Sequence, residues 1–138
     1  MGDPLSILGA IAAASQLAQE ASKITKFFSA LYAKIQDAGE SIRKRMLHIE
    51  QLIDISKLIA KTLTLQTTAI QSVLVACLRT TITLHDILQE FSSDEEGLLR
   101  RIMKAVKAVR KEDKIMILLD NIEREKSSLA LCIHQIDA

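Results

Sequence analysis

The sequence predicts an all-α protein, an up-and-down bundle of about five helices. Its composition is that of a globular domain, because 49% of the 138 residues are hydrophobic and 25% are charged. Turn-forming residues are scarce, since the whole chain holds 4 Gly and 1 Pro. Apolar residues recur at helical spacing, and no segment alternates apolar with polar residues for long enough to predict a strand. A chain of this length can bury a core without disulfides, so residues 1–138 are expected to form a single helical-bundle domain.

The first helix is predicted from Pro4 to about Gln36. Asp3 can cap free backbone N–H groups, and a proline at the first helical position loses no hydrogen bond. Gly39 suits the left-handed conformation that often ends a helix. Apolar residues three or four positions apart are expected to form the buried seam of this helix: Ile7, Ala10, Ala14, Leu17, Ala21, Ile24, Phe28, Leu31 and Ile35.

The next two helices are predicted at 40–61 and 65–91. The earlier one is ordinarily amphipathic, with apolar residues on one face and charged residues on the other. The later one follows a stretch without charge from Thr62 to Leu78, which indicates a central, largely buried helix.

A fourth helix is predicted at 94–110. Ser92 and Ser93 stand three positions before two glutamates, so either serine can form a capping box that opens it. A charged corner at 111–113 then leads into a fifth helix. Short connections between long helices favour antiparallel neighbours, which is the basis of the up-and-down topology.

The sequence contains no recognisable catalytic motif. The glycine-rich phosphate loops and the nucleophile elbow are absent, and no two of the histidines have the spacing that chelates zinc on a helix. His48, His85 and His134 are expected at the surface or at its boundary. Cys77 and Cys132 are too far apart in sequence to indicate a metal site and are expected as buried, reduced thiols. We expect no enzyme activity, no cofactor, no metal and no small-molecule substrate.

The chain is uncharged from Pro4 to Gln19, and no apolar run reaches the roughly 18–20 residues that span a bilayer. Near the start of this stretch both sides of the helix are apolar, with Leu5, Leu8 and Ala12 on one side and Ile7, Ile11 and Ala14 on the other. One interpretation is a helix buried centrally in the bundle. The other is an end that detaches and enters a bilayer or a partner's groove. The two are compatible, because a switch can bury at rest what it exposes when active.

Basic residues are concentrated at 100–114, a segment that contains seven basic residues and two acidic ones. If the helix continues through Lys114, one cationic stripe results, with Arg101 and Arg110 flanking Arg100, Lys104, Lys107, Lys111 and Lys114. Such a stripe attracts anionic lipid, at about 1 kcal/mol per basic side chain near a charged surface. A solvated helix face is the alternative. Nucleic acid is not an expected partner, because the chain has no Trp and a single Tyr to stack on bases.

The opening segment Asp3-Pro4-Leu5-Ser6-Ile7-Leu8-Gly9-Ala10-Ile11-Ala12-Ala13, followed by long amphipathic helices, resembles the HeLo-like N-terminal domains of fungal STAND (NOD-like) receptors and amyloid-signalling cell-death proteins. The resemblance covers essentially the whole chain, and the DPLS string is its specific part. It implies a helical-bundle execution domain of programmed cell death that, once oligomerised by its parent protein, targets and permeabilises membranes through its N-terminal helix. The implied membrane-insertion residues are Leu5, Ile7, Leu8 and Ile11, with Gly9 and Ala10 allowing close approach of helices.

These observations lead to the hypothesis of a membrane-permeabilising cell-death domain activated by oligomerisation. Its predicted partners are anionic membrane lipids, further copies of itself, and an upstream receptor or amyloid-signalling module in a parent protein from which the chain is excised. It is expected in the cytoplasm at rest and at the plasma membrane on activation. The expected anionic-lipid contacts are Arg100, Arg101, Lys104, Lys107, Lys111 and Lys114. The alternative is a non-lytic interaction or oligomerisation module of a fungal NOD-like receptor, in which Leu5 and Leu8 form a protein interface.

Overall fold

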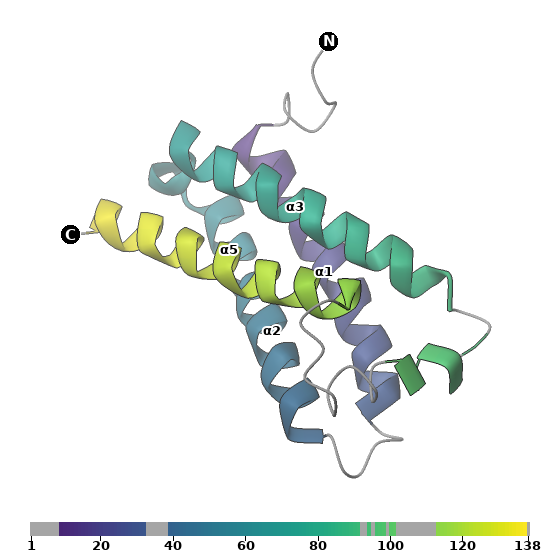
Figure 1. Ribbon diagram of the computed structural model, residues 1–138. Coiled ribbons are helices and arrows are strands. Elements are labelled where there is room, and N and C mark those ends of the chain that lie inside the picture. The colour runs from purple at the N-terminus through teal and green to yellow at the C-terminus, as the bar shows by residue number, and fades with distance from the viewer. Residues whose placement is uncertain are drawn as a thin grey trace.

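The computed structural model describes residues 9–32, 39–91, 94, 96–98, 100–101 and 113–137, and every regular element in these ranges is a helix (Figure 1). The elements are α1 (Ala10–Tyr32), α2 (Gly39–Lys61), the 3-10 turn η2 (Leu63–Leu65), α3 (Thr68–Gln89) and α5 (Lys114–Asp137). The all-α bundle is therefore confirmed. Of the helix predicted at 94–110, residues 96–98, 100 and 101 are helical, and most of the remainder lies outside the described residues.

The observed start of α3 differs from the prediction. The chain turns through η2 and enters α3 at Thr68, whereas the apolar pattern had placed the helix start at 65. Thr67 explains the later start, because its side chain accepts a hydrogen bond from the backbone N–H of Ile70 at 3.2 Å and so caps the helix. Leu65 is still part of the core, with 3% of its surface exposed, so its apolar character reflects burial in a turn.

The four long helices form a ring in which α1 packs against α2 and α3, while α5 packs against α3 and α2. The four long helices α1, α2, α3 and α5 alternate in direction along the chain (Figure 1). Neighbours in the ring are not all antiparallel, however. The contacts of Arg45 with Asp120 and of Gln51 with Lys126 show that α2 and α5 run in the same direction. The connection between α2 and α3 joins opposite corners of the ring, so chain order does not determine which helices are neighbours.

The predicted seam of α1 is buried wherever the structure describes it. Ala10, Ala14, Leu17, Ala21, Ile24 and Phe28 all belong to the core, together with Ala13. Ile11 was predicted on the same side as Ala14, and this is wrong, because 53% of its surface is exposed. The buried stripe passes through Ala13 and Ala14 and leaves Ile11 on the outer side of the helix.

The prediction that α3 is central and largely buried is wrong, because α3 is one of four helices in the ring and has exposed residues along its length, among them Ser72, Arg79 and Asp86. It contributes nine buried residues, including Leu74, Leu78, Leu84 and Leu88. Its buried hydroxyl at Thr81 donates to the backbone carbonyl of Cys77 at 2.7 Å, which avoids the cost of an unpaired polar group in the core.

Candidate functional site

The described residues of the two predicted site regions lie at opposite ends of the bundle. Gly9 immediately precedes α1, whereas Arg100 and Arg101 follow the last turn of α3, and both helices begin at the same end (Figure 1). Because α3 has 22 residues, it spans about 33 Å at 1.5 Å per residue. An upright bundle therefore brings only one of the two regions to a flat bilayer, and contact by both requires its long axis to lie along the surface.

At the N-terminal end, the structure separates the predicted insertion residues by their environment. Leu5, Ile7 and Leu8 lie outside the described residues. Ala10 belongs to the core, while Ile11 faces outwards. A Cβ atom at Gly9 would meet nothing within 4 Å among the described residues, and the close approach of helices at this glycine stays a prediction for the inserted state.

At the opposite end, Asp113 interrupts the predicted cationic stripe. Its Oδ1 atom accepts hydrogen bonds from the backbone N–H groups of Ile115 at 2.9 Å and Met116 at 3.3 Å, which is the geometry of a helix N-cap. Lys114 therefore belongs to the first turn of α5, and the helix that contains Arg100 does not continue through it. The single cationic stripe was predicted only if one helix continued through Lys114, and this helix does not.

Arg101 is held in place at this corner. Its Nε donates to Oδ2 of Asp113 at 3.2 Å, and its guanidinium lies over the ring of Phe91 at 5.8 Å from the centroid. This cation already has a carboxylate partner, which reduces its availability to lipid phosphate. Arg100 and Lys114 are exposed, and the predicted lipid contacts at Lys104, Lys107 and Lys111 lie outside the described residues.

A row of polar contacts joins α2 to α5. Arg45 donates to Asp120 at 2.7 Å, and Nε2 of His48 lies 3.2 Å from a carboxylate oxygen of Glu123. Lys126 donates to Nδ1 of His48 at 2.8 Å, which assigns the ring proton to Nε2. The signal was present in the sequence as matching steps of three on the two helices, but only the packing shows that they are neighbours.

The contact between α1 and α3 includes a buried histidine. His85 is 9% exposed, so its expected place at the surface or boundary is wrong. Its Nδ1 lies 3.2 Å from Oε2 of Glu20, and Phe27 meets its ring edge-on at 6.1 Å between centroids. Glu20 is the first charged residue after the uncharged stretch, and this contact ties α1 to α3 at that point.

Cys77 on α3 and Glu125 on α5 are two titratable groups whose pKa values are raised by burial. Burial raises the pKa of the Cys77 thiol far above its usual range, and the charge of Glu125 adds to this effect. Burial likewise raises the pKa of Glu125, against the opposing effects of a hydrogen bond from Thr80 and the charge of Arg124. One carboxylate oxygen of Glu125 is buried without a hydrogen-bond partner. Cys77 is thus an inert structural thiol as expected, whereas Cys132 is only half-buried.

Replacing Glu125 with Gln is expected to raise the melting temperature at pH 7 by a few degrees, because it removes the penalty for a partly buried charge. The folded-state pKa lies above that of a free glutamic acid, about 4.3, so wild-type stability improves as the pH falls through the raised pKa towards that value. Thermal melts at pH 7 and pH 5 should show the advantage of Glu125→Gln shrinking on acidification. Glu50→Gln, at an exposed position, is the matched control. A lower melting temperature for Glu125→Gln at pH 7 would contradict this account.

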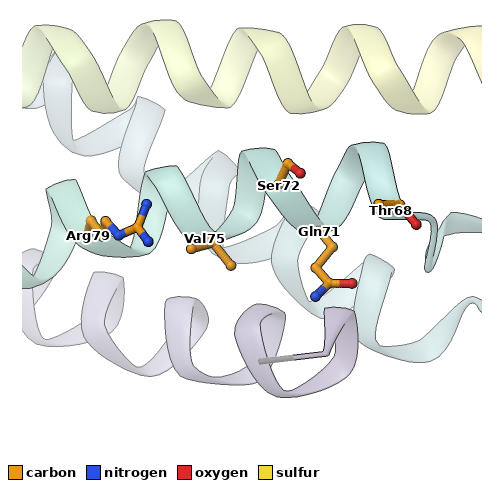
Figure 2. Close-up of a pocket in the computed structure, with 5 residues that line it drawn as sticks. All are labelled: Thr68, Gln71, Ser72, Val75 and Arg79. Carbon is orange, nitrogen blue, oxygen red and sulfur yellow. The ribbon is translucent and has the colours of Figure 1, made fainter. Parts of the chain in front are cut away.

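A shallow depression of about 330 Å³ lies along α3 and is lined by Thr68, Gln71, Ser72, Val75 and Arg79. Figure 2 shows these side chains following one another along the helix, with Gln71 and Val75 directed towards α1. The lining contains one charged group and no acid–base pair, so it offers no evident machinery for catalysis.

Neither a candidate metal site nor a candidate membrane span occurs in the described residues. No three metal-ligating side chains come together in these ranges. Within the same ranges, no helix combines the length and apolar character needed to cross a membrane.

Comparison of the chain with known protein families, with curated proteins and with solved structures found no match in any of the three. What supports a function is therefore the chemistry and placement of the residues themselves.

Proposed function

We propose that this chain is a membrane-targeting, membrane-permeabilising cell-death execution domain that acts when several copies oligomerise. The observation that carries the proposal is the uncharged stretch from Pro4 to Gln19, which resembles the start of HeLo-like domains. The helical bundle is compatible with that resemblance. At the point where this stretch joins the bundle, Ile11 presents an apolar side chain to the outside.

In the proposed mechanism, the membrane-active part is the segment before Ala10, and α1 stays in the bundle. Leu17, Ile24 and Phe28 are each no more than 2% exposed. Withdrawing such side chains costs about 1.5–3 kcal/mol each, so release of the whole helix approaches the stability of a typical domain. A segment this short cannot span a bilayer alone, and several copies must therefore insert together.

The proposed partners are anionic membrane lipids, other copies of the chain, and an upstream receptor or amyloid-signalling module in the parent protein. The proposed location is the cytoplasm at rest and the plasma membrane after activation. Oligomerisation raises the local concentration of the apolar segments, so that several of them insert into the membrane together.

Dye release from anionic vesicles tests the proposal. The full chain, fused to an inducible dimeriser or a coiled-coil oligomer, is expected to release dye from phosphatidylserine-containing vesicles, and the monomeric chain is expected to release little. Phosphatidylcholine vesicles provide the control for charge dependence. If the oligomerised protein neither binds nor permeabilises anionic vesicles, the proposal fails.

A non-lytic interaction module is the second candidate. It is favoured by apolar side chains on the outer faces of the helices, among them Leu47 at 51% and Leu131 at 58% exposure. Such a module would self-associate or bind a partner protein without lipid. Concentration-dependent oligomerisation of the chain, combined with no effect on vesicles, would identify this function.

A further inference from the structure

Exposed apolar side chains gather at one end of the bundle. Seven large hydrophobic residues are exposed in the described ranges, and five of them lie near the start of α1, the end of α2, η2 or the end of α5. These parts of the chain lie at the same end of the bundle (Figure 1). We call this set the apolar end; its members are Ile11, Leu58, Leu63, Leu131 and Ile136. The uncharged N-terminal stretch joins the bundle at this end.

Leu63 is the most exposed member, with 82% of its surface accessible, and it stands on a well-anchored turn. Leu65 N–H donates to the carbonyl of Thr62 at 3.0 Å, and Gln66 N–H donates to the carbonyl of Leu63 at 3.1 Å. The Gln66 side chain donates to the carbonyl of Ile59 at 3.3 Å, while Leu65 is buried. The turn thus holds Leu63 outwards without further ordering on binding, which lowers the entropy cost of inserting it.

The charge around this turn is positive. Residues 55–85 contain Lys57, Lys61 and Arg79 and no acidic residue, and both lysines are exposed on the last turns of α2. Among the described residues, Asp137 at the last position of α5 and Asp54, one turn before Leu58 on α2, are the acidic residues nearest to this end. An apolar tip beside lysines matches the layered chemistry of an anionic bilayer, in which phosphate lies above hydrocarbon.

We propose that η2, with Leu63 at its tip, is a second membrane anchor that enters the interface of an anionic bilayer beside the N-terminal segment, with Lys57 and Lys61 contacting headgroup phosphates. This inference rests on the proposed function and adds the orientation of the bundle: the apolar end faces the membrane, and the corner at Arg101 faces away. Leu63, with 82% of its surface exposed, projects from this turn as a single apolar side chain. A fluid bilayer accommodates such a tip readily, whereas a protein partner would need a matching pocket.

Tryptophan fluorescence can test the anchor directly, because the chain has no Trp of its own. Leu63→Trp and the matched control Leu47→Trp each introduce one fluorophore at an exposed leucine position on the bundle surface. Leu47 lies 14 residues before the end of α2, about 21 Å along the helix. With the oligomerised full chain on anionic vesicles, emission of Leu63→Trp is expected to shift to the blue and to be quenched by brominated lipid, while Leu47→Trp is unchanged.

Vesicle flotation provides a second readout that does not depend on the fluorophore. Leu63→Glu is expected to weaken binding about tenfold or more, and Leu47→Glu to leave it within about twofold. Circular dichroism checks that both variants remain folded.

The outcomes separate the two proposals. If the wild-type protein binds vesicles but the probe at 63 stays in water and Leu63→Glu binds normally, the anchor is refuted and the proposed function stands. If the emission shift occurs on oligomerisation without lipid, this surface joins protein copies and the anchor is again refuted. If no variant binds vesicles, the proposed function fails and the anchor fails with it.

Discussion

Deleting residues 2–8 is expected to abolish vesicle permeabilisation by the oligomerised chain while leaving the bundle folded. The deletion removes the apolar side chains Leu5, Ile7 and Leu8, and each would contribute about 1.5–3 kcal/mol on entering hydrocarbon. The loss in dye-release rate should therefore exceed about tenfold. The structure sets the limit of the deletion, because removal through residue 14 would also take Ala10, Ala13 and Ala14 out of the core.

A variant with Leu5 and Leu8 both changed to Ser is the finer test of the same prediction. This variant keeps the chain length, and we expect its melting temperature to stay close to that of the wild type while vesicle permeabilisation is lost. Unchanged dye release by both the deletion and the double variant would show that the N-terminal segment is not the membrane-active element.

Leu17→Ala is expected to lower the free energy of unfolding by about 2–5 kcal/mol. Leu17 is fully buried in the core, so truncation leaves a cavity that neighbouring helices can fill only in part. A domain of this kind has roughly 5–15 kcal/mol of total stability, and the change is thus a large fraction of it. Urea denaturation followed by circular dichroism measures the difference.

Leu47→Ala is the control for that measurement, because Leu47 is 51% exposed on α2 and its truncation should change stability by no more than about 0.5 kcal/mol. A loss below about 1 kcal/mol for Leu17→Ala would mean that α1 is weakly held. The whole helix could then leave the bundle on activation, and the mechanism would no longer be confined to the segment before Ala10.

The position of the basic corner changes the membrane hypothesis. From sequence, the cationic stripe and the apolar segment were expected to act on the same bilayer, but one lies beyond α3 and the other precedes α1. Arg101 is also engaged with Asp113. Under the proposed function, Lys57 and Lys61 at the apolar end supply positive charge on the side of the bundle where α1 begins, without requiring the distant corner.

Helix content and most of the buried seam could be predicted from the sequence, because both depend on local spacing. Ala14, Leu17, Ala21, Ile24 and Phe28 recur at three- and four-residue steps, and one face of a helix must then be apolar whatever its neighbours are. The edges of that face were less predictable. Ile11 is apolar but exposed, because the width of the buried stripe depends on how closely α2 and α3 approach.

The sequence by itself determined that this protein is an all-α bundle and that its first stretch is uncharged, since both follow from residue types along the chain. Only the tertiary structure decided which helices are neighbours, that His85 is buried and Glu125 partly buried, and which exposed leucines share an end with the start of α1. The physical reason is that periodicity specifies a face of each helix but not its partner. Which helix packs against that face depends on the packing of all the helices together, and hence on contacts between residues far apart in the chain.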